Sequence, residues 1–232
     1  FSFGELPDNY SHWIVKFRND GRNSVGDPVD IGRQEMAYAD MAREAGLDVP
    51  RTHLVELKVN RKQEAYFAVQ RFDRVGQRKV YFLSLAGYAY ASHREPCLDY
   101  SSGVLAATRK LTKSDKDVAM AYRLMLFNVL AHNKDDHSKN FAYLLDPLKK
   151  TWRLAPAYDL TFNNGAGNPT FKDLKKVASE RGVKHWQEIL DSVRGAVANW
   201  GAFARKYDLS DMRTKDIAKE LLAVDRACRA EA

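Results

Sequence analysis

The chain has 232 residues, of which 45% are hydrophobic and 29% charged, a composition typical of a folded globular protein rather than a disordered one. No run of about 18 uncharged apolar residues occurs, which excludes a membrane span, and Cys97 and Cys228 are too far apart in sequence to form a C-x-x-C metal motif. The 37 Lys and Arg against 30 Asp and Glu give a net charge of +7, typical of a solvated basic surface or of a phosphate-binding protein.

The first third of the chain combines strands with one helix. Residues 12–17 form a short β-prone run, and residues 34–45 carry an apolar stripe that Gly46 ends. Residues 53–59 and 64–72 are predicted to pair as a hairpin. The order strand, helix, strand, strand predicts an α+β fold rather than a regular βα repeat.

The remainder is predicted to be mostly helical. Residues 115–132 form a helix that is apolar nearly all round and therefore buried. Two short strands follow at 141–145 and 151–154, with a turn between them. Three further helices are predicted at residues 171–181, 185–207 (with a break near Gly195 or Gly201 as an alternative) and 211–230. The change of character indicates two lobes that join near residues 70–74.

Nine consecutive polar residues, 132–140, lie between the buried helix and an apolar strand, as catalytic loops do. Asp135 and Asn140 place a carboxylate and an amide in this loop, and phosphoryl transfer uses such a pair as base and Mg²⁺ ligand. Asp159 follows a Pro turn and is either a cap residue or, returned by the predicted hairpin, a second oxygen ligand for Mg²⁺.

Lys16 lies within an otherwise apolar strand, where it either extends to solvent from a sheet edge or holds a phosphate. Glu35 on the next helix is a candidate acid to orient it. The order Lys, Glu, Asp…Asn, Asp is that of protein kinases. A competing hypothesis is a metal hydrolase built on His132, Asp136 and His137 with Asp135.

Six segments together resemble the HipA family of bacterial serine/threonine kinases, the toxins of HipBA-type toxin–antitoxin modules. They are W-I-V-K-F at 13–17, A-R-E-A-G-L-D-V-P at 42–50, Q-R-F-D-R at 70–74, N-K-D-D-H-S-K-N-F at 133–141, L-A-P-A-Y-D-L at 154–160 and V-R-G-A-V-A-N-W at 193–200. The resemblance implies an α+β, protein-kinase-like two-lobed fold, with a mixed N-lobe at 1–72 and a helical C-lobe at 73–232.

The resemblance also implies an ATP site. Lys16 matches the lysine that holds the ATP phosphates, with Glu35 as its ion-pair partner. Gln70 and Phe72 match the hinge whose backbone meets adenine, and Asp73 would lie near the ribose. Gln at position 70 departs from the family's usual Glu but leaves the backbone contacts available.

The catalytic roles are carried over in the same way. Asp135 matches the catalytic base, and Asn140 and Asp159 match the Mg²⁺ ligands. Lys139 is expected to steady the γ-phosphate, and His137 belongs to the same motif with a structural role. The implied reaction is transfer of the ATP γ-phosphate to a protein Ser or Thr.

The implied partners are a HipB-like antitoxin, DNA only through that antitoxin, and a protein substrate of the aminoacyl-tRNA synthetase class, all in the cytoplasm. Two departures stand against an active kinase. Fifteen residues precede Lys16, without the family's Gly-rich, Ser-containing loop, and the loop at 159–169 looks shorter than its counterpart. The alternatives are that segments are missing, which we favour, or that the chain is a catalytically impaired, pseudokinase-like module that binds an antitoxin.

Overall fold

A computed structural model describes residue 7 and residues 10–19, 27–59, 61–90, 99–163 and 169–229. Cys97 and His93 lie outside the described residues, as do residues 1–4 and most of the Asn/Gly-rich loop predicted after residue 162. Within the described part of the chain, no helix has the length and apolar character that crossing a membrane requires.

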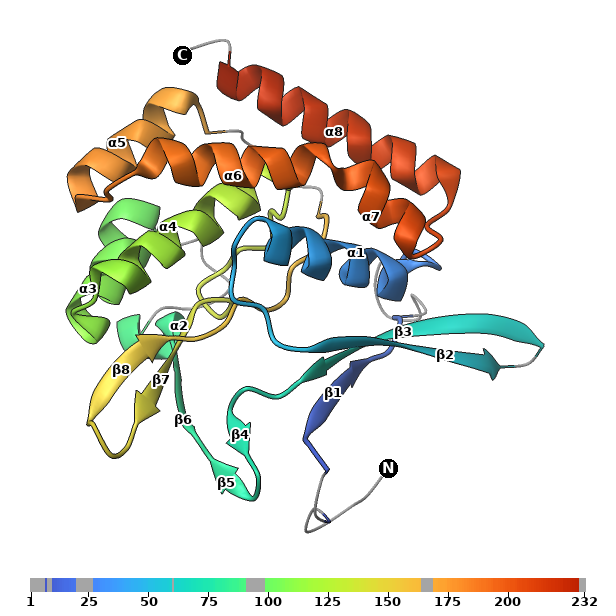
Figure 1. Cartoon of the computed structure of the whole chain (residues 1–232), viewed down its shortest axis with the longest axis horizontal. Helices are drawn as coiled ribbons and strands as arrows, with labels where there is room; N and C mark the ends of the chain where they lie inside the picture. The colour runs from blue at the N-terminus through green and yellow to red at the C-terminus, as the bar shows by residue number, and fades with distance from the viewer. Residues whose placement is uncertain are drawn as a thin grey trace.

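The N-terminal part contains a three-stranded antiparallel sheet and one helix (Figure 1). The sheet has the order β1-β3-β2, formed by β1 (Trp13–Lys16), β3 (Lys62–Gln70) and β2 (Thr52–Val59). Helix α1 (Ile31–Glu44) packs against one face of this sheet. The predicted strand, helix, strand, strand order is therefore confirmed, although α1 begins three residues earlier than its apolar stripe.

The early start of α1 has a steric explanation at Gly32. A Cβ at this position would lie 2.3 Å from the carbonyl oxygen of Ala65 on β3, closer than van der Waals contact permits. Only glycine allows the first turn of the helix to approach the strand this closely. The helix ends as predicted at Gly46, whose φ of +81° is the left-handed conformation typical of helix termini.

A second antiparallel sheet follows, with the order β6-β7-β8. The sequence predicted β7 (Ala142–Asp146) and β8 (Thr151–Leu154), but it missed β6 (Tyr81–Ser84) and the two-residue hairpin strands β4 (Arg74–Val75) and β5 (Arg78–Lys79). These strands have two to four residues and largely exposed side chains, so no alternating pattern marks them.

The helical part agrees with the prediction for its long helices. The observed helices after α1 are α2 (Leu85–Ala89), the π-helix η1 (Tyr100–Leu105), α3 (Ala106–Thr112), α4 (Asp115–Leu130), α5 (Phe171–Arg181), α6 (Trp186–Ala198), α7 (Trp200–Lys206) and α8 (Asp211–Arg229). The break between α6 and α7 falls at Asn199, whereas Gly195 and Gly201 both lie inside helices. The sequence did not predict α2, η1 or α3.

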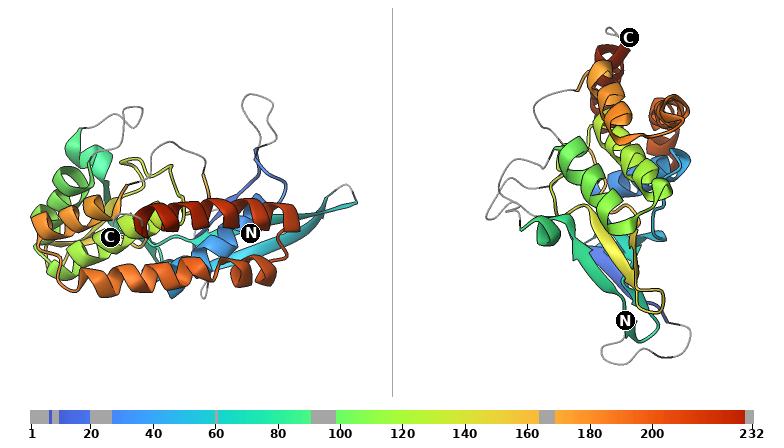
Figure 2. Two further views of the ribbon diagram at one scale, coloured as in Figure 1. Left: turned by 90° about the horizontal axis from the view of Figure 1, so that it is seen from above. Right: turned by 90° about the vertical axis from the view of Figure 1, so that its left-hand side faces the viewer.

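The main hydrophobic core lies around α4, whose Leu126 and Phe127 are fully buried. Residues of α1, α6, α7 and α8 belong to the same core, so α1 packs on one side against the sheet and on the other against the C-terminal helices. Figures 1 and 2 show the long helices on one side of the molecule and the two sheets on the other. Helix α1 is thus held firmly between the two halves.

Candidate active site

Lys16 is at the end of β1 and extends toward two carboxylates from distant parts of the chain. Its Nζ lies 2.6 Å from Oε1 of Glu35 on α1 and 2.5 Å from Oδ1 of Asp159 in the loop after β8. The three residues span 143 positions of sequence and meet at one point. The structure therefore brings together three of the residues that the sequence selected for phosphate and Mg²⁺ binding.

Burial and charge act against each other at this point. Burial alone would lower the pKa of Lys16, but the carboxylates of Glu35 and Asp159 outweigh it, so the pKa is raised above 10.5. For Glu35, burial is the larger effect and raises the pKa above 4.5 in spite of the Lys16 ammonium. With all three groups ionised, the cluster carries a net charge of −1.

This cluster forms one end of a cavity of about 400 Å³ between the first sheet, α1 and the loop after β8. The walls are mainly apolar, and the volume falls in the usual range for small-molecule sites. The residues of the wall include Ile14, Val49, Phe67, Val69, Phe72 and Leu160. A mainly apolar wall that also holds an ammonium and two carboxylates suits a small molecule with an aromatic part and a charged part.

The predicted hinge also lines this cavity, through Gln70, Phe72 and Asp73. It lies farther along β3 than Lys16, which is opposite Phe67, whereas Gln70 is opposite Trp13. The N–H of Gln70 already donates to the carbonyl of Arg51, at 2.8 Å. Phe72, by contrast, makes no backbone hydrogen bond to any other described residue. The N–H of Gln70 is therefore occupied, whereas both backbone groups of Phe72 are available to a ligand.

Asp73 lines the cavity, but its carboxylate is held by two arginines. Arg71 donates to both oxygens, at 2.8 and 2.6 Å, and Arg74 donates to Oδ2 at 2.9 Å. These hydrogen bonds, that of Arg71 above all, lower the pKa of Asp73 below 3.8. A ribose hydroxyl would therefore meet a fully ionised carboxylate whose position is fixed.

The predicted catalytic loop follows α4, and the carboxylate of Asp135 in this loop extends into solvent. The side chain of Asp135 is 54% exposed, and its Oδ1 lies 3.8 Å from Nε2 of His137. Nδ2 of Asn140 donates to the backbone carbonyl of Asp135, at 2.7 Å. This bond closes the loop, and Lys139 within it is exposed.

A hydrogen bond joins this loop to the segment that carries Asp159. The hydroxyl of Tyr158 donates to the carbonyl of Lys139, at 2.5 Å. Each partner is the immediate neighbour of a predicted Mg²⁺ ligand, because Lys139 precedes Asn140 and Tyr158 precedes Asp159. Mg²⁺ prefers oxygen ligands, and the amide oxygen of Asn140 and the carboxylate of Asp159 are both of this kind. These residues therefore fit a Mg²⁺ site whose other ligands would be phosphate oxygens and water.

The alternative metal hydrolase is not supported by the geometry. Nδ1 of His132 is bound to the carbonyl of Asn163, at 2.9 Å, and Asp136 accepts a hydrogen bond from Tyr100. Within the described ranges, no group of three or more His, Cys, Asp or Glu side chains is placed to hold a metal ion. The polar cluster at 132–140 thus does not converge on one point.

Sequence reasoning selected Phe72 for its backbone alone and missed the two aromatic side chains that lie beside its ring, those of Phe82 and Tyr158. The rings of Phe72, Phe82 and Tyr158 lie with their centroids 5.5 to 6.4 Å apart. Tyr158 was within reach of prediction because it immediately precedes Asp159 in the motif. Phe82 was not, because it belongs to the unpredicted strand β6.

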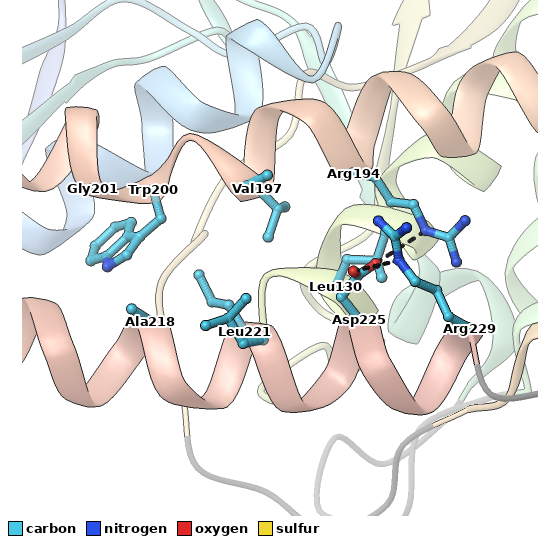
Figure 3. Close-up of a pocket in the computed structure, with 11 residues that line it drawn as sticks. Leu130, Arg194, Val197, Trp200, Gly201, Ala218, Leu221, Asp225 and Arg229 are labelled. Atoms are coloured by element: carbon cyan, nitrogen blue, oxygen red, sulfur yellow. Dashed lines mark hydrogen bonds and ion pairs between the residues drawn. The ribbon is translucent and has the colours of Figure 1, made fainter.

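A second cavity, of about 170 Å³, lies between α6, α7 and α8 (Figure 3). Its walls are largely apolar, and at one end Asp225 faces two arginines. Oδ1 of Asp225 lies 3.3 Å from Nε of Arg194, and Oδ2 lies 2.7 Å from Nε of Arg229. The charged groups are paired with one another, and this cavity contains none of the residues predicted for the site.

Comparison with known sequences identifies the family. The sequence model of the HipA-like C-terminal domain matches residues 3–228. "Putative kinase Y4dM" of Sinorhizobium fredii (strain NBRC 101917 / NGR234) is 30% identical over 158 residues, which are 64% of this chain. The match covers 36% of that relative, so the chain spans about a third of its length.

Two solved structures share the fold. HipA of Shewanella oneidensis MR-1, solved with HipB and operator DNA, has a TM-score of 0.60 at 11% identity, over 98% of this chain and 66% of that one. The Helicobacter pylori proinflammatory kinase CtkA has a TM-score of 0.62 at 14% identity, over 95% of this chain and 88% of that one. The fold is therefore the α+β, kinase-like fold of these proteins. The chain belongs to the HipA-like C-terminal domain family.

Proposed function

We propose that this chain is an ATP-dependent serine/threonine protein kinase of the HipA toxin type. The observation that carries the proposal is the position of Lys16, in contact with both Glu35 and Asp159 at the end of a nucleotide-sized cavity. Membership of a HipA-like family and a relative named as a kinase support the class of activity.

The nucleotide would lie along the cavity, with its base at the hinge and its phosphates at the charged end. The base would stack among the aromatic rings near Phe72, and the free backbone groups of Phe72 would recognise its edge. Lys16 would hold the phosphates, and Glu35 would keep the Lys16 ammonium oriented. Mg²⁺, held by Asn140 and Asp159, would supply the positive charge that a triphosphate needs beside two carboxylates.

The chain's own contribution to the reaction would be mainly positioning. Asp135 is exposed at the end of a pinned loop, where it can orient a substrate hydroxyl and accept its proton. Lys139, exposed on the same loop, would steady the transferred phosphoryl group. The phosphoacceptor would be a Ser or Thr of a protein, as the resemblance to the HipA family implies, and the exposed side chain of Asp135 is accessible to such a partner.

We propose in addition that the partner is a HipB-like antitoxin, because the Shewanella HipA was solved together with HipB and operator DNA. Contact with DNA would then arise only through the antitoxin. Copurification of the chain with a coexpressed HipB-like protein tests this partner. A complex retained at 0.5 M salt would support specific association, and a complex lost at that salt concentration would indicate attraction by charge alone.

The test of the kinase function is transfer of label from [γ-³²P]ATP to protein serine or threonine, in the presence and absence of Mg²⁺. Asp135→Asn should lower the rate at least 100-fold and leave the melting temperature unchanged, because Asp135 is exposed. Asp191→Asn, an exposed carboxylate on α6, is the matched control. Nucleotide binding without any transfer in the wild-type protein would instead favour the pseudokinase-like binding module.

A further inference from the structure

A chain of side-chain contacts begins beside Glu35, at the buried residue Gln34. This residue is 1% exposed, so its amide must find partners inside the protein. Nε2 of Gln34 donates to Oγ1 of Thr161, at 2.7 Å. Thr161 is two residues after Asp159, so the amide of Gln34 ties the helix that carries Glu35 to the segment that carries Asp159.

The other end of this amide is held by helix α8. Nε of Arg213, in the first turn of α8, donates to Oε1 of Gln34, at 2.8 Å, across 179 positions of sequence. Because the Gln34 oxygen accepts from Arg213 and the Gln34 nitrogen donates to Thr161, one orientation of the amide satisfies both ends. Arg213 therefore determines which way Gln34 points.

Arg213 also contacts the same segment directly. Its guanidinium lies over the ring of Phe162, 5.1 Å from the ring centroid, as in a cation–π pair. The Phe162 ring is stacked on His132, with centroids 5.1 Å apart and an interplanar angle of 16°. His132 lies three residues before Asp135, at the start of the predicted catalytic loop.

We propose that Arg213 is a positioning residue of the site. Through its contacts with Gln34 and Phe162, it fixes the positions of α1, the segment after Asp159 and the start of the catalytic loop relative to one another. The effect on catalysis rests on the proposed function; the effect on geometry does not. Helix α8 would thereby be part of the active machinery, although it contributes no group to the cavity at Lys16.

Other contacts anchor the start of α8 and do not reach the site. The N–H of Ser210 donates to Oδ2 of Asp30, at 3.1 Å, and Nη1 of Arg33 donates to the carbonyl of Tyr207, at 3.0 Å. These bonds hold the α7–α8 connection against α1 whether or not Arg213 is present. Substitution of Arg213 therefore removes the positioning contacts while α8 stays in place.

The geometric test needs no catalysis. The ¹³Cε and ¹⁵Nζ resonances of Lys16 report its ion pairs with Glu35 and Asp159. Arg213→Gln and Gln34→Ala should each shift these resonances, whereas Arg226→Gln, an exposed arginine on the same helix, should not. Lys16 resonances in Arg213→Gln that match those of the wild-type protein would overturn the proposal. Arg213→Lys, a milder change, serves in the same test if Arg213→Gln fails to fold.

The kinetic test asks whether Arg213 acts through Gln34. Phosphotransfer by Arg213→Gln should fall at least fivefold in kcat, with Arg213→Lys intermediate and Arg226→Gln unchanged. The double variant Gln34→Ala/Arg213→Gln should lose less than the product of the two single effects, because both changes remove the same Arg213–Gln34 hydrogen bond. Multiplied effects of the two changes would contradict action through Gln34. If the wild-type protein transfers no phosphate, the proposed function fails, and the Lys16 resonances still decide the role of Arg213.

Discussion

Lys16 and Asp159 are 143 positions apart in the sequence, and the fold brings Nζ of the first to 2.5 Å from Oδ1 of the second. Asp159 is thus paired with the lysine proposed to hold phosphate, and it is itself proposed to hold Mg²⁺. For Lys16 to bind phosphate and Asp159 to bind Mg²⁺, the ion pair between Lys16 and Asp159 must partly open. Binding of the nucleotide and binding of the cation should therefore be coupled.

The first prediction concerns Glu35 and the pH dependence of phosphotransfer. Burial raises the pKa of Glu35 above its usual 4.5, so this carboxylate gains a proton earlier than an exposed one as the pH falls. Protonated Glu35 no longer pairs with Lys16 as an ion. We expect kcat/KM for ATP to fall as the pH is lowered through this raised pKa.

Glu35→Gln should lower kcat/KM at neutral pH by about one order of magnitude, as expected for the loss of a charged hydrogen-bond partner. It should also remove that part of the decrease in kcat/KM at low pH that protonation of Glu35 causes. Rates measured between pH 5 and 8 for both proteins check this. A decrease of the same shape and midpoint in Glu35→Gln would assign it to another group.

The second prediction concerns the close approach of α1 to β3. A Cβ at Gly32 would lie 2.3 Å from the carbonyl oxygen of Ala65, and both groups belong to backbone that has little freedom to move. Gly32→Ala should therefore lower the free energy of unfolding by about 1–3 kcal/mol.

Gly195→Ala is the matched control, because Gly195 is an exposed residue inside α6 with no atom within 4 Å of an added Cβ. The same substitution should there stabilise the protein by roughly 0.5–1 kcal/mol. Urea unfolding of the two variants should give shifts of opposite sign. Equal stability of Gly32→Ala and the wild-type protein would show that α1 and β3 are not in this contact.

The third prediction concerns Asp40, which fixes α1 to the C-terminal helices. Its Oδ2 accepts from Lys206 at 2.5 Å and from Tyr207 at 2.6 Å. Burial acts to raise the pKa of Asp40, but these hydrogen bonds outweigh it and hold the pKa below 3.8. The folded-state pKa is thus below the unfolded one, so Asp40 contributes stability above about pH 4 and loses it as the pH falls through the lowered value.

Asp40→Asn should accordingly cost about 1–2 kcal/mol at pH 7 and progressively less below pH 4. Urea unfolding of variant and wild type at a series of pH values gives the difference directly. Asp191→Asn should show little difference at any pH. A difference for Asp40→Asn that stays constant down to pH 2 would mean that the charge of Asp40 does not contribute.

Much of this site could be predicted from the sequence because its parts are local motifs. The loop from Asp135 to Asn140 stands out as a polar run beside apolar elements, and Asp159 stands out as an acidic residue after a Pro turn in a segment that resembles a family motif. Helix α1 and the β2–β3 hairpin followed from periodicity and turn residues. The long helices α4, α5 and α8 followed from their apolar stripes and end signals in the same way.

What the sequence did not reveal depends on long-range contacts. Gln34, Phe82 and Arg213 gain their importance from neighbours that are distant in the chain, and nothing in their local context marks them. The strands β4 to β6 are too short and too exposed for a periodic signal. The early start of α1, with Gly32 in its first turn, likewise depends on the approach of β3, since glycine itself predicts no helix.

The most direct test of the account is the affinity for ATP with and without Mg²⁺, measured by calorimetry on the wild-type protein, Lys16→Met and Asp159→Asn. We expect Mg²⁺ to tighten ATP binding to the wild-type protein at least tenfold. Asp159→Asn should lose that gain and bind Mg²⁺-free ATP at least as tightly as the wild-type protein, because it removes a carboxylate beside Lys16. Lys16→Met should weaken binding in both conditions. ATP affinity that is independent of Mg²⁺ in the wild-type protein, or unchanged in Lys16→Met, would contradict the assignment of this cavity to Mg·ATP.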